Sequence, residues 1–151
     1  MHRLTLGSVV LSCAVLWGCG DSGTSSGCDT GEVECDGVCI PAIEPVIEGE
    51  SGIQAGVFDV SCASSACHDA DAPAQGLDLS DAMASAMSTI GVTATELDRP
   101  LVDPGNPDNS YLFDKIIGEN LAPGTQRMPI GGQLCDVKIE AVEAWILDGA
   151  P

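Results

Sequence analysis

Residues 62–68 have the sequence Cys62-Ala-Ser-Ser-Ala-Cys67-His68, which has the pattern C-x4-C-H. Each thiol can form a thioether with one vinyl group of a haem, and the imidazole beside the second thiol is then held beneath the iron as an axial ligand. The usual spacing is C-x-x-C-H, so this stretch is a longer variant. The alternative is a small loop closed by a disulfide, with an incidental histidine.

The length and the charge of the chain limit what it can be. Its 151 residues are enough for one domain and a leader, and its formal charge is −18. The only basic residues are Arg3, Arg99, Lys115, Arg127 and Lys138, which form no basic cluster in the sequence. Nucleic acid and anionic membrane surfaces are therefore poor partners. The acidity serves solubility, or alternatively docking to a basic partner.

Aromatic residues are scarce in the part of the chain that follows the leader. Only Phe58, Tyr111, Phe113 and Trp145 are found there. A domain of about 100 residues with so few large rings gains stability from an additional apolar body at its centre. A haem would be such a body, and disulfides could stabilise the domain instead.

Residues 1–18 are predicted to be a lipoprotein signal peptide. The apolar stretch is too short to span a membrane, and Leu16-Trp-Gly-Cys19 resembles the lipobox of bacterial lipoproteins. By that resemblance the chain is cleaved before Cys19, which is lipidated. We therefore expect a lipid-anchored protein of the cell envelope, in the periplasm or on the cell surface. The alternative is an ordinary secretory signal that is cleaved nearby.

Two short segments follow the predicted signal peptide. Residues 19–27 are Gly- and Ser-rich and form a flexible tether, and residues 28–48 form a short Cys-rich segment. Cys28, Cys35 and Cys39 are expected to form disulfides rather than a zinc site, because no fourth ligand lies nearby. Their number is odd, and Cys135 is the candidate partner. If the C-x4-C-H cysteines carry haem, these four make two disulfides; otherwise six cysteines can make three, with open connectivity.

Residues 49–151 are predicted to be mainly α-helical, with no repeats and no βαβ pattern. We expect an irregular Pro/Gly-rich loop over residues 121–134. On the second helix, Met83, Met87 and Ile90 would form one apolar stripe. The expected helices cover residues 53–62, residues 80–90 with a Ser80 cap, residues 111–117 with a Ser110 cap, and residues 136–148 with an Asp136 cap.

His68 is the only histidine after the leader, so the second axial ligand of a haem iron would be a methionine. Met83 and Met87 lie on a helical stripe, where methionine usually packs in a core. Met128 lies in the irregular loop, where no periodicity explains it, and is the candidate ligand. Arg127 beside it could bind a haem propionate, or could be a solvent-exposed surface arginine.

With these residues assembled, residues 53–150 resemble the small c-type cytochrome domains of class I. The order is an aromatic four residues before the first cysteine (Phe58), the C-x4-C-H stretch, a late Met loop and a final helix with Trp145. Residues 76–80, 102–112, 127–129 and 145–150 are similar to the planctomycete-type cytochrome c domain. The resemblance implies a helical fold around one covalent haem c, with Cys62 and Cys67 attached, His68 proximal and Met128 distal.

The resemblance implies a membrane-anchored monohaem cytochrome that transfers single electrons between redox protein partners and is not an enzyme. The alternative is a haem-free, disulfide-stabilised binding or structural lipoprotein on the same scaffold, which the longer spacer and the additional cysteines favour. A haem module that senses redox state is a third interpretation.

Overall fold

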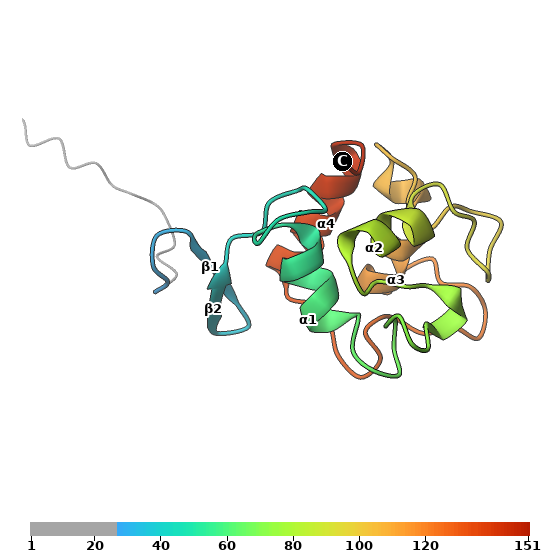
Figure 1. The fold of residues 1–151 in the computed structure, drawn as a ribbon, viewed down its shortest axis with the longest axis horizontal. Helices are drawn as coiled ribbons and strands as arrows, with labels where there is room; N and C mark the ends of the chain where they lie inside the picture. Colours follow the sequence, from blue (N-terminus) through green and yellow to red (C-terminus); the bar gives the residue numbers. More distant parts are fainter. Residues whose placement is uncertain (1–26) are drawn as a thin grey trace, which may run out of the picture.

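The computed structural model describes residues 27–151. The predicted signal peptide (1–18), the lipidation site Cys19 and nearly all of the tether (19–27) therefore lie outside the described residues. Figure 1 shows a small hairpin at one end of the described chain, followed by a helical body. Among the helices within residues 27–151, none has the length and apolar character that crossing a membrane requires.

The Cys-rich segment contains a β-hairpin that the sequence analysis did not predict. Strands β1 (Glu32–Cys35) and β2 (Val38–Pro41) are antiparallel and are joined by a two-residue turn. Both turn residues, Asp36 and Gly37, have positive φ, as the type I′ turn favoured by Asp-Gly requires. One disulfide, Cys28–Cys39, closes the hairpin.

The second disulfide, Cys35–Cys135, joins the hairpin to the residue that precedes the last helix. Within residues 27–151, the four cysteines outside the C-x4-C-H stretch are thus paired with one another, and Cys135 is the partner of Cys35 in the Cys-rich segment.

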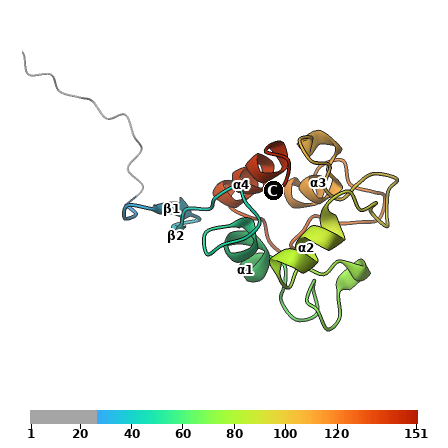
Figure 2. The ribbon, with the colours of Figure 1, turned by 45° about the horizontal axis from the view of Figure 1, so that its top comes forward.

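The helical body follows the predicted order of elements. The C-x4-C-H stretch comes after a helical segment that begins as a π-helix (η1) and continues as α1. In the two views of Figures 1 and 2, α1 lies between the hairpin and α2, and α3 packs against α4. The elements are η1 (Gln54–Phe58), α1 (Asp59–Ser61), η2 (Ala74–Gly76), α2 (Ala82–Thr89), η3 (Pro107–Asn109), α3 (Tyr111–Ile117) and α4 (Asp136–Leu147).

The core joins the segment before the C-x4-C-H stretch to the last helix. Phe58 and Trp145 are both buried, and their rings meet edge to face with centroids 6.2 Å apart. Such a pair contributes about 0.5–1.5 kcal/mol beyond the burial of its apolar area. Val142 and Ile146 of α4 are fully buried in the same cluster. Phe58 and Trp145, the two aromatic residues on which the resemblance to cytochrome c domains partly depends, are therefore in direct contact.

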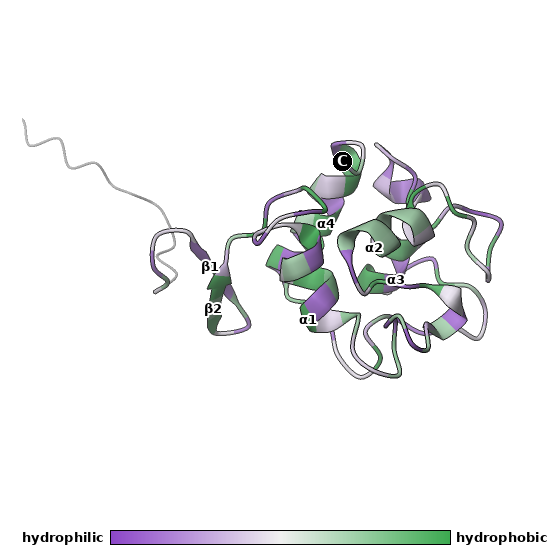
Figure 3. Ribbon diagram, viewed as in Figure 1, coloured by the Kyte–Doolittle hydropathy of each residue, from purple (hydrophilic) through white to green (hydrophobic). Residues whose placement is uncertain are grey.

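The predicted apolar stripe on α2 is wrong. Met83 and Met87 are 71% and 74% exposed, whereas Ser85 and Thr89 are fully buried. The buried hydroxyls have partners, since Ser85 donates to Gln54 Oε1 at 2.7 Å and Thr89 donates to the Ser85 carbonyl at 2.7 Å. The hydrogen bond to Gln54 of η1 therefore explains why the face of α2 that carries Ser85 and Thr89 is buried. In Figure 3, α2 is coloured mostly in green tones, although its methionines face solvent.

The helix starts differ from the predicted caps by about one residue. Asp81, not Ser80, caps α2, with its carboxylate accepting the Ala84 N–H at 2.9 Å. Ser110 precedes α3 as predicted, but its hydroxyl makes no cap hydrogen bond to that helix. Asp136 is the first residue of α4 rather than its cap, because Cys135 occupies the cap position.

Candidate cofactor-binding cavity

A cavity of about 340 Å³ lies within the helical body. This volume is in the range of small-molecule binding sites, which are largely apolar and contain a few polar groups. Segments from η1 to α4 contribute to its wall. The aliphatic and aromatic part of the lining includes Val57, Phe58, Leu79, Leu112, Ile116 and Val142.

Three of the predicted site residues line this one cavity. Cys62 follows α1, His68 follows the loop of the C-x4-C-H stretch, and Met128 lies in the loop between α3 and α4. Met128 is far from the other two in the sequence, and the fold brings it to the apolar space that Cys62 and His68 line. A thiol, an imidazole and a thioether therefore face a common site.

The orientation of His68 is fixed by the backbone around it. Its Nδ1 lies 3.1 Å from the carbonyl oxygen of Leu77. Because a carbonyl can only accept, this contact places the ring proton on Nδ1 and leaves the lone pair of Nε2 free. Metal-binding histidines commonly have their other ring nitrogen held in this way. The ring is thus prepared to donate through Nε2.

The two thiols of the C-x4-C-H stretch have different surroundings. Both are free in the structure, bonded neither to each other nor to another cysteine of residues 27–151. Cys62 lines the cavity, and burial raises the pKa of its thiol to about 11, an effect that nearby Lys138 opposes. The thiol is therefore neutral and unreactive toward disulfide exchange near pH 7. Cys67 is exposed and is not part of the cavity wall.

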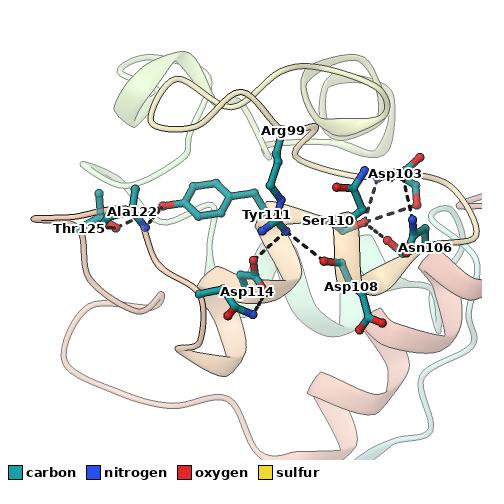
Figure 4. Close-up of polar contacts among 11 residues, drawn as sticks. Arg99, Asp103, Asn106, Asp108, Ser110, Tyr111, Asp114, Ala122 and Thr125 are labelled. Atoms are coloured by element: carbon teal, nitrogen blue, oxygen red, sulfur yellow. Dashed lines mark hydrogen bonds and ion pairs between the residues drawn. The ribbon is translucent and has the colours of Figure 1, made fainter.

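The loop that carries Met128 is attached to α3 at several points. The Met128 N–H donates to the Lys115 carbonyl at 2.7 Å. The hydroxyl of Tyr111 accepts the Ala122 N–H at 3.2 Å and lies 3.2 Å from Thr125 Oγ1, as Figure 4 shows. Helix α3 therefore holds this Pro/Gly-rich loop against the cavity without a helical structure in the loop.

Arg127 has two protein partners. Its guanidinium donates to the Ile117 carbonyl at 2.5 Å and to Gln133 Oε1 at 2.6 Å. A cation that binds a carbonyl of the last turn stabilises the C-terminus of a helix. Arg127 does not contribute to the cavity wall. The structure gives it the role of ending α3, and its contact with a propionate stays a prediction.

Lys115 is a lining residue that the sequence analysis missed. It lies four residues after Tyr111 on α3, so the two side chains share one helix face, and its Nζ lies 5.8 Å from the centre of the Tyr111 ring. The sequence feature that could have pointed to Lys115 is that it is the single basic residue in a mostly apolar helix.

Comparisons of the chain with protein-family models, with curated proteins and with solved structures find no match. The chemistry of the cavity therefore has to be judged from its own residues. An imidazole with a free Nε2, a thioether and a neutral thiol around an apolar space fit a c-type haem, which uses these donors. Cys67 is the exception to this fit, because it lies outside the wall.

Proposed function

We propose that the chain is an exported, lipid-anchored monohaem c-type cytochrome that transfers single electrons between protein partners. The observation that carries the proposal is that Cys62, His68 and Met128 line one apolar cavity. No periodic pattern in the sequence requires these three side chains to meet, and a stable core alone does not require an imidazole and a thioether there.

Each residue has a defined task under this proposal. His68 would donate through Nε2, with Leu77 fixing the ring, and Met128 would donate its sulfur from the loop attached to α3. Haem held there would supply an iron that changes oxidation state by one electron. If His68 and Met128 both held the iron, the haem would favour electron transfer over oxygen chemistry, and the methionine would raise its reduction potential. We therefore assign no enzymatic reaction to the chain.

One observation favours the alternative of a haem-free, disulfide-stabilised lipoprotein. Cys67 is exposed and is not a lining residue, whereas attachment of haem through two thioethers needs both sulfurs at the edge of the haem. In that case the cavity would bind another apolar molecule. The two proposals differ in whether haem is attached covalently.

Matched methionine variants test the ligand assignment in protein produced with a c-type maturation system. Met128→Ala is expected to keep covalent haem but to open the sixth site, seen as loss of the six-coordinate spectrum and binding of added carbon monoxide. Met87→Ala is the control, because Met87 is 74% exposed and should leave the spectrum unchanged. His68→Ala is expected to prevent stable haem incorporation. An unchanged spectrum in the Met128→Ala protein would remove Met128 from the site.

A further inference from the structure

Lys115 stands apart from the other basic side chains of residues 27–151. Within this range its amine makes no hydrogen bond and no ion pair, and it lies 5.8 Å from the centre of the Tyr111 ring. The other basic residues have partners: Arg99 pairs with Asp114 at 2.8 Å, Arg127 donates to the Ile117 carbonyl, and Lys138 donates to Ser61 Oγ at 3.1 Å.

The acidic groups near Lys115, which are Asp114, Glu96 and Glu119, form no ion pair with its amine. Asp114, the neighbouring residue, is 2% exposed, pairs with Arg99 and accepts from the side chain of Asn120. Glu96 is the acid among the cavity-lining residues, but it is exposed and accepts from the Thr95 hydroxyl. Within residues 27–151, the Lys115 amine at the apolar wall therefore has no carboxylate partner.

A half-buried ammonium beside an apolar space is costly unless a negative group meets it. The Tyr111 ring compensates only in part, since a cation–π contact contributes about 0.5–1 kcal/mol at an exposed site and more where it is desolvated. A largely apolar ligand that carries a carboxylate would fill the cavity and form an ion pair with the Lys115 amine.

We infer that Lys115 binds a carboxylate of the molecule that occupies the cavity. The inference rests on the proposed function, under which that carboxylate is a haem propionate. Lys115 then has the role that the sequence analysis gave to Arg127. The contact would lower the pKa of the propionate, because a nearby positive charge favours the ionised form.

The pH dependence of the reduction potential of the holoprotein tests this contact. When a haem propionate ionises, its negative charge lowers the reduction potential of the iron, and this fall occurs over a pH window centred on the pKa of the propionate. Lys115→Gln is expected to move that window upward by about 1 pH unit or more, since a close opposite charge shifts a carboxyl pKa by about 1–3 units. Lys138→Gln is the matched control, because that side chain donates to Ser61 and does not line the cavity. Arg127→Gln tests the competing propionate contact that the sequence predicted.

The outcomes separate this inference from the proposed function. The Lys115 contact is contradicted if Lys115→Gln leaves the pH window of the reduction potential unchanged, or if Arg127→Gln moves that window further than Lys115→Gln does. Neither result would contradict the cytochrome. Lys115→Arg keeps the charge, so its window should stay near that of the wild type, and a displacement equal to that of Lys115→Gln also overturns the inference. Absence of covalent haem from the wild-type protein would instead contradict the proposed function itself.

Discussion

Replacement of Tyr111 by Phe is expected to weaken the attachment of the Met128 loop to α3. The Tyr111 side chain is 1% exposed, and its hydroxyl accepts the N–H of Ala122, a residue that is 5% exposed. Removing the hydroxyl leaves this backbone donor buried without a partner. The ring and its packing stay in place, so the change acts on the hydrogen bonds alone.

The expected cost follows from the group that is left unsatisfied. A buried donor without an acceptor costs about 1–3 kcal/mol, so the free energy of unfolding of Tyr111→Phe should fall by that amount. Urea unfolding of the disulfide-bonded protein, with the slope checked for two-state behaviour, measures the change. In the haem-loaded protein the same variant should also weaken the bond between Met128 and iron, seen in the spectrum of the oxidised form.

Thr125→Val provides the matched control for the same cluster. It removes the second hydroxyl but leaves the Ala122 N–H bonded to Tyr111, so its cost should stay below that of Tyr111→Phe. The double variant should then cost less than the sum of the two, because the hydroxyls interact. If Tyr111→Phe lies within about 0.5 kcal/mol of the wild type, as an ordinary surface substitution would, the attachment described here is wrong.

Two further predictions concern the cysteines. The haem-free protein should lose about 2–3 kcal/mol of stability as the pH rises from 9 to about 11, because the Cys62 thiol ionises first in the unfolded chain. Cys62→Ala should lack this loss. If the free energy of unfolding falls with pH equally in the wild type and in Cys62→Ala, the burial of the thiol is contradicted. Removing Cys35–Cys135, which spans 100 residues, should cost about 5 kcal/mol, against about 3 kcal/mol for Cys28–Cys39, which spans 11. Denaturant unfolding of paired serine variants measures both, and a larger loss for Cys28–Cys39 would contradict the loop-entropy reasoning.

Helices α3 and α4 show what the sequence could predict. Their apolar residues recur at helical spacing, and Val142, Trp145 and Ile146 are buried as that spacing predicts. The hairpin was missed although its Asp36-Gly37 turn is a strong local signal, because the three nearby cysteines were interpreted only as a disulfide knot.

Other features depend on contacts that no local pattern contains. The buried face of α2 is decided by Gln54, which lies on a different helix and accepts a hydrogen bond from Ser85. Likewise, whether Arg127 or Lys115 reaches the cavity depends on how the Met128 loop lies against α3. Hydrophobic periodicity describes one element at a time and could not decide between the two basic side chains.

The measurement that tests the central claim most directly is the visible spectrum of the exported protein as a denatured pyridine adduct, after production with a c-type maturation system. The proposed function predicts a c-type α-band that survives acid–acetone extraction, which establishes covalent haem. Absence of the band, in protein whose two disulfides have formed, would contradict the cytochrome and leave the haem-free binding lipoprotein in its place.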